Sequence, residues 1–187
     1  MTDVKAVSTA RFHTGIIKTD DSLWMCGENE YGEIGDGTGS YHRTPVKIAD
    51  NVKTVSLGYN HTAFLKNDGT LWTCGLNEDG QLGDGTRINR NTPVQIMSDV
   101  KDVSAGDLYT AILKTDGTLW VCGSNTWGQY GNGTTSRNQT PVQIMSNVKT
   151  INAGGGHTAV IMNDGSLWMS GYNAWGQVGD GTTENKT

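Results

Sequence analysis

The segment Leu71–Thr86, LWTCGLNEDGQLGDGT, gathers the side chains most able to do chemistry in this chain. Its residues Asn77, Asp79 and Asp84 carry oxygen atoms of the type that binds calcium. An EF-hand loop that began at Asn77 would need glycine at its sixth position and glutamate at its twelfth, and the sequence has leucine and isoleucine there. The spacing argues against a calcium site, and we expect neither a metal nor a cofactor.

The same segment recurs at a fixed distance, which changes how its residues should be interpreted. LWMCGENEYGEIGDGT begins at Leu23, LWVCGSNTWGQYGNGT at Leu119 and LWMSGYNAWGQVGDGT at Leu167. The shared tryptophans stand 48 residues apart without insertion, at Trp24, Trp72, Trp120 and Trp168. Residues 1–187 are therefore predicted to form a single array, with repeat units 4–51, 52–99, 100–147 and an incomplete 148–187.

A residue that recurs once per unit is a poor candidate for catalysis, because an active site needs different groups that converge on one point. His13, His61 and His157 occupy one column of the repeat, where the third unit has Tyr109. We expect this column to join adjacent strands or units by a hydrogen bond, and the column tryptophans to lie in the core. No nucleophile elbow, phosphate loop or zinc-protease motif stands outside the repeat, so we predict that the chain is not an enzyme.

Cysteine usage follows the same period. Cys26, Cys74 and Cys122 share a column that holds Ser170 in the last unit. Equivalent positions of successive units should lie further apart than the ~7 Å between Cα atoms that a disulfide allows. We therefore predict buried, unpaired thiols in a reducing compartment such as the cytoplasm.

Each unit contains segments of strand character and no helical periodicity. In the second unit these segments are 52–58, 61–67, 70–75 and 93–97. Asp68-Gly69 predicts a two-residue type I′ hairpin, with positive φ at both positions, and the first unit has Asp20-Asp21 there, which should form the same turn with some strain. Because proline cannot donate to a ladder, the segment that opens with Pro93 is expected at the edge of the sheet.

Four-stranded antiparallel sheets that repeat every ~40 to 50 residues are typical of a β-propeller. The pattern AG..HTA.L..DG.LW..G.N..GQ.G.GT......PV resembles the regulator-of-chromosome-condensation repeat, and the resemblance covers Val4 to Thr187. It implies an all-β propeller, which members of that family close with seven blades. The members include a guanine-nucleotide exchange factor for a small GTPase and a bacterial inhibitor of β-lactamases. This chain has fewer than four complete units, so we expect about four blades, a partial or half propeller.

If the recurring columns build the scaffold, specificity should lie where the units differ. In an antiparallel blade, the loop between the first and second strands and the loop between the third and fourth strands lie at the same end. We call this end the loop face. The predicted partner-binding residues are the varying apolar and aromatic residues of these loops: Phe12, Tyr31, Tyr59, Leu108, Trp127, Tyr172 and Trp175.

The loop face is not uniform around the array, because acidic residues mark the first two units and aromatic residues the last two. These are Glu28, Glu30, Glu78 and Asp79 on the one hand, and Trp127, Tyr172 and Trp175 on the other. Exposed aromatic residues beside a polar rim favour a scaffold that binds another protein. Two alternatives stay open: aromatic platforms that stack on a carbohydrate, and a column that packs each loop onto its own blade.

Charge and hydropathy limit the other partners. The formal net charge of −5 argues against a general nucleic-acid binder. Nowhere do ~18 apolar residues run together, and the N-terminus has no apolar signal core, so we expect no membrane partner and no secretory leader.

A partial propeller leaves the faces of its first and last units without neighbouring blades, which favours association. Two chains of about four units would make eight blades, within the usual range of about four to eight. We therefore expect a homodimer that closes an eight-bladed ring. The alternatives are a half propeller cut from a longer chain, whose main property is self-assembly, and a closed four-bladed monomer.

Overall fold

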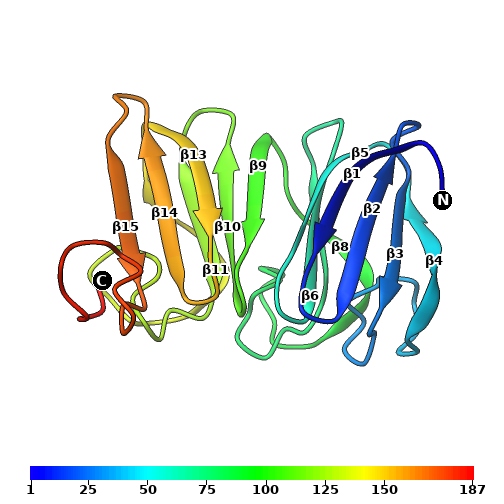
Figure 1. Cartoon of the computed structure of the whole chain (residues 1–187), viewed down its shortest axis with the longest axis horizontal. Coiled ribbons are helices and arrows are strands. Elements are labelled where there is room, and N and C mark those ends of the chain that lie inside the picture. Colours follow the sequence, from blue (N-terminus) through cyan, green and yellow to red (C-terminus); the bar gives the residue numbers. More distant parts are fainter.

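The computed structural model describes all 187 residues and contains fifteen strands in four antiparallel sheets, or blades (Figure 1). Blades 1 and 2 comprise β1 (Val4–Thr9), β2 (His13–Lys18), β3 (Leu23–Gly27) and β4 (His42–Ala49), then β5 (Val52–Leu57), β6 (His61–Lys66), β7 (Leu71–Gly75) and β8 (Arg90–Met97). Blades 3 and 4 comprise β9 (Val100–Ala105), β10 (Tyr109–Lys114), β11 (Leu119–Gly123) and β12 (Asn138–Met145), then β13 (Val148–Ala153), β14 (His157–Met162) and β15 (Leu167–Gly171). The predicted all-β propeller array is confirmed.

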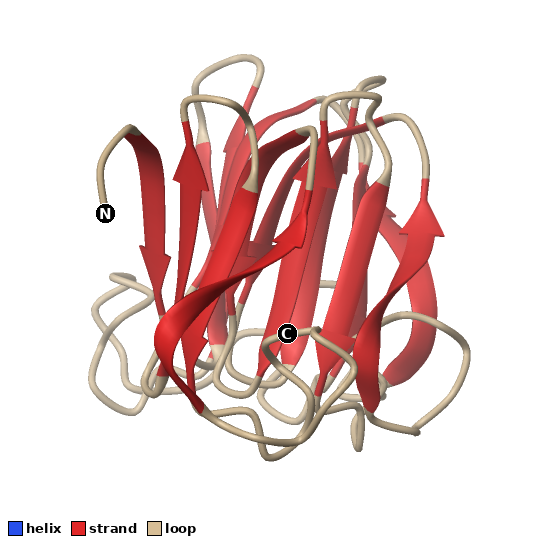
Figure 2. Cartoon of the chain, turned by 90° about the vertical axis from the view of Figure 1, so that its right-hand side faces the viewer, coloured by secondary structure: helices blue, strands red, loops and turns tan.

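The strands of each blade pair in chain order, so the long loops all lie at one end of the molecule. This end, the loop face, is at the bottom of Figures 1 and 2, and Figure 2 shows strands and loops alone. No helix long and apolar enough to cross a bilayer is present.

The fourth strand of blade 2 lies at the edge of its sheet, as predicted for the segment that contains Pro93. The strand is longer than predicted, because β8 begins at Arg90. Its register with β7 shifts between Thr73 and Gly75, opposite the segment that holds the proline. A bulge at a sheet edge tolerates a residue without an N–H group, which explains how proline fits inside the strand.

The hairpin between the second and third strands is not the type I′ turn that the sequence predicted. Gly69 has a φ of 82°, but Asp68 does not have a positive φ. The Gly69 amide donates to the Lys66 carbonyl at 3.0 Å, and the Lys66 amide donates to the Thr70 carbonyl at 2.9 Å. This is a three-residue loop, a type I turn followed by one left-handed residue. Only that residue needs a positive φ, and Asp21 supplies it in blade 1 with a φ of 62°.

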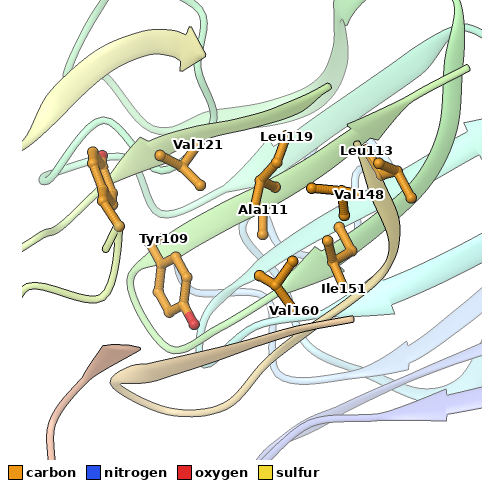
Figure 3. Close-up of a cluster of buried hydrophobic side chains, with 9 residues drawn as sticks. Tyr109, Ala111, Leu113, Leu119, Val121, Val148, Ile151 and Val160 are labelled. Carbon is orange, nitrogen blue, oxygen red and sulfur yellow. The ribbon is translucent and has the colours of Figure 1, made fainter. Parts of the chain in front are cut away.

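The hydrophobic core lies between successive blades. Each of three clusters combines residues of two neighbours, and the largest joins Leu113 and Leu119 of blade 3 to Val148, Ile151 and Val160 of blade 4 (Figure 3). A single sheet cannot cover its own apolar face, so each blade is stabilised by the next. We call each contact between successive blades a joint.

The column tryptophans are less buried than predicted. Trp24, Trp72 and Trp120 are half-buried, whereas Trp168 is exposed. Trp72 and Trp120 pack on the clusters at the first and second joints. The indole N–H of Trp72 donates to Thr70 Oγ1 in the hairpin at 2.9 Å, and Trp120 bonds Thr118 in the same way. The rings therefore lie at the rim of the joint, because the indole N–H needs a polar partner.

Candidate functional site

Buried asparagines hold the long loops of the loop face in place. In blade 2, Asn77 Nδ2 donates to Asp84 Oδ1 at 3.0 Å and to the Thr86 carbonyl at 3.1 Å. Asp84 also pairs with Arg90, with 2.7 Å between Oδ2 and Nη2. Asn77 Oδ1 accepts the Leu82 amide at 3.0 Å, so the oxygen atoms of Asn77 and Asp84 are engaged within the loop, while Asp79 pairs with a residue of the next blade. No three His, Cys, Asp or Glu side chains gather in the structure.

His13 and His61 join neighbouring blades, as predicted for the histidine column, whereas the His157 ring in blade 4 makes no hydrogen bond. His13 Nε2 lies 3.1 Å from Thr62 Oγ1 of the next blade, and that hydroxyl donates to the Glu33 carbonyl at 2.7 Å. Because the only hydroxyl proton is used on the carbonyl, His13 is the donor through Nε2. Cys74 Sγ lies 3.6 Å from the same carbonyl. One loop carbonyl therefore accepts two donors from the following blade.

The second and third joints repeat this arrangement with different residues. His61 Nε2 lies 3.0 Å from Thr110 Oγ1, which donates to the Gln81 carbonyl at 2.7 Å. At the third joint the hydroxyl of Tyr109 replaces the imidazole and lies 2.9 Å from Thr158 Oγ1. The column is thus a structural contact that tolerates either side chain.

Burial makes these groups unsuited to acid–base or nucleophilic chemistry. It lowers the pKa of His13 to about 4 and that of His61 to about 3, because the charged imidazolium would lose its hydration. It also raises the pKa of Cys74 far above its ordinary value and that of Cys122 to about 12. Both thiols are buried and unpaired as predicted, while Cys26, in blade 1, is half-buried.

The predicted partner-binding residues divide into two clusters on the loop face. In the first cluster, at the joint of blades 1 and 2, the Phe12 and Tyr59 rings meet edge to face with centroids 6.2 Å apart. The Arg11 guanidinium lies 4.9 Å from the Phe12 centroid and 5.3 Å from the Tyr59 centroid. The cation covers both rings, so this cluster presents a charged surface as well as an aromatic one.

The second cluster spans the joint of blades 3 and 4. The centroids of Trp127 and Tyr172 lie 5.0 Å apart with the ring planes tilted by 53°. With Leu108, these rings line a cavity of about 250 Å³, and Trp127 remains 44% exposed. Trp127 therefore packs across the joint on the neighbouring blade.

Two predicted residues stand outside both clusters. Trp175 is 86% exposed, whereas Tyr31 is half-buried. Arg137 was not among the predicted residues, yet its Nη1 lies 2.6 Å from Asp79 Oδ1 in the preceding blade. This pair offsets part of the acidic character expected for blade 2. The signal available in the sequence was that the column of Arg137 varies between units.

Comparisons with known proteins agree with the geometry. Two models described as Regulator of chromosome condensation (RCC1) repeat match the chain, one at residues 20–65, 68–113 and 116–161 and the other at residues 52–81, 100–129 and 148–177. No curated protein sequence matches.

Several solved structures share the fold. Human WBSCR16 superposes with a TM-score of 0.87 at 24% identity, over 100% of this chain and 53% of that one. Prp20p from Saccharomyces cerevisiae gives 0.81 at 20% identity, over 98% and 49%. The structure of Kap60 bound to yeast RCC1 (Prp20) gives 0.83 at 18% identity, over 98% and 47%. The chain thus spans about half the length of the solved chains it matches.

Proposed function

This chain belongs to the family of regulator of chromosome condensation repeats, and from that premise we propose that it is a non-enzymatic scaffold that binds another protein through the loop face. The observation that carries the proposal is the pair of Trp127 and Tyr172 beside an open cavity. Large aromatic side chains at a pocket are the commonest anchors of protein interfaces.

The chemistry around the pair supports this assignment. Asp107, Ser124 and Gln129 line the same cavity, so polar groups surround the aromatic centre. Interfaces between proteins commonly combine an apolar centre with such a rim.

The two loops that carry the pair are also held rigidly. Asn125 Oδ1 accepts the Tyr130 amide and Asn173 Oδ1 accepts the Val178 amide, each at 2.9 Å. A surface that is already ordered before binding loses less conformational entropy in the complex.

The identity of the partner does not follow from the relatives. The structure of Prp20p was described together with its binding properties to Gsp1p and histones, but the identity with this chain is 20%. We therefore propose a protein partner without naming it, and neither a nucleic acid nor a membrane.

Replacing Trp127, Tyr172 and Trp175 together with alanine is expected to weaken partner binding by at least ~30-fold, because hot-spot residues contribute about 2 kcal/mol or more. The immobilised chain would be exposed to an extract of the source organism, and the affinity of each captured protein would then be measured by interferometry. Tyr41→Ala is the matched control, since Tyr41 is exposed in blade 1, outside both clusters.

Equal capture by the triple variant and by the wild type, with unchanged melting temperatures, would contradict the assignment to this cluster. If Phe12→Ala with Tyr59→Ala abolished capture instead, the first cluster would be the binding surface. Binding to a glycan array that is lost in Trp127→Ala would replace the protein partner by a carbohydrate.

A further inference from the structure

Blades 1 and 4, at the right and left of Figure 1, form the two ends of the array. Their end faces expose residues whose counterparts are buried at the internal joints. Val7 of blade 1 is 64% exposed and Leu167 of blade 4 is 61% exposed. Their counterparts Val55 and Leu119, one repeat away, are buried against a neighbouring blade. Each end of the chain therefore carries one half of a joint.

The polar groups at the two ends are also complementary halves. At an internal joint, the leading blade supplies an imidazole or phenol and a loop carbonyl, and the following blade supplies a threonine and a cysteine or serine. The last blade has His157 and the Gln177 carbonyl in the leading positions. The first blade has Thr14 and Cys26 in the following positions.

We propose that blade 4 of one copy docks on blade 1 of a second copy in the geometry of the internal joints. Thr14 of the second copy then donates to the carbonyl of Gln177 and accepts the Nε2 proton of His157. Cys26 of the second copy approaches the same carbonyl, as Cys74 approaches that of Glu33 at 3.6 Å. We assign a second copy of this chain to the exposed face of blade 4, because its first blade supplies both the hydrogen-bond donors and the apolar face that cover such a surface at the internal joints.

A joint between unlike faces either closes a ring or grows into a filament. Each chain has four blades, so two copies together supply eight, which is within the range of about four to eight blades found in closed propellers. Two such joints are therefore expected to close a dimer around a common axis, which leaves no free end face.

Blocking one end at a time tests the joint. Val7→Lys places a charge on the face of blade 1, and Leu167→Lys places one on the face of blade 4. Both side chains are exposed in the single chain, so neither change should disturb its fold. By light scattering at micromolar concentration, the wild type is expected at twice the chain mass of 20.1 kDa, and each variant alone at 20.1 kDa. An equimolar mixture of the two variants should recover a dimer, because one joint remains intact.

Three outcomes would overturn the proposal. A monomeric wild type would remove the joint itself. If either variant alone formed dimers, the face of blade 1 would pair with another blade 1, or that of blade 4 with another blade 4. A mass that grows beyond the dimer with concentration would exclude a closed ring of two chains.

The hydrogen-bond register has its own test. His157→Ala should raise the dissociation constant of the dimer by at least ~10-fold, because the hydroxyl oxygen of Thr14 in the second copy would lose its hydrogen bond from His157 and stay buried without a donor. His157→Tyr should restore it, because Tyr109 fills this position at the third joint. The melting temperatures of His157→Ala and His157→Tyr in the monomeric Val7→Lys background show whether either change affects the fold of the single chain rather than the dimer. Equal dissociation constants for the wild type and His157→Ala would overturn the proposed hydrogen bond between His157 and Thr14 of the second copy.

Discussion

Lowering the pH from 8 to 5 is expected to reduce the free energy of unfolding by about 4 kcal/mol, through His13 and His61. Burial lowers the pKa of His13 to about 4 and that of His61 to about 3, whereas both titrate near 6.5 in the unfolded chain. Between these values the unfolded chain binds protons that the folded chain does not. Stability is therefore complete above pH 6.5 and falls below it, by roughly 2 kcal/mol for each histidine at pH 5.

The measurement is the urea midpoint at several pH values between 8 and 5. His61→Tyr is the matched control, because Tyr109 occupies the same position one blade later and reaches the same kind of threonine. Phenols do not titrate in this range, so the variant should lose about half of the pH dependence. A variant that keeps the full slope would show that the joint histidines do not govern acid stability.

Gly80→Ala is expected to destabilise the fold by at least ~3 kcal/mol, and Gly176→Ala by only about 1 to 2 kcal/mol. Both glycines have positive φ, 86° and 75°, so both variants lose the energy of a left-handed side chain. A Cβ atom on Gly80 would also lie 2.6 Å from Gln139 Cα in β12 of the next blade. On Gly176 the nearest such atom is 4.0 Å away.

Urea unfolding of the two changes in the monomeric Val7→Lys background separates these effects, because there the loop of blade 4 faces no neighbouring blade and the difference measures the close approach of the Gly80 loop to blade 3. Equal losses of stability would mean that glycine is required only for its backbone conformation.

The sequence was sufficient for the features that depend on period and side-chain type. The 48-residue repeat located the blades, proline placed the edge strand, and the histidine column predicted the contact between blades. The turn at Asp68-Gly69 was wrong because the dipeptide fits two hairpin types, and the choice depends on how Lys66 and Thr70 pair.

The arrangement of the loop face could not be predicted. Trp127 meets Tyr172 across a joint, and Arg137 meets Asp79 of the preceding blade. Such pairs depend on how two separate loops fold and on the distance between blades. The sequence therefore supplied the candidate residues but not their division into two clusters.

The pairing of strands in chain order has a mechanical consequence. Force applied at the two termini can detach one blade without unthreading another, because no strand is shared between sheets. Each complete repeat then releases 48 residues, or about 160 Å of extended chain before its folded width is subtracted. Blade 4, with three strands, should yield first. Optical-tweezer traces should show evenly spaced steps set by the repeat length, and a single large step would mean that the blades rupture together.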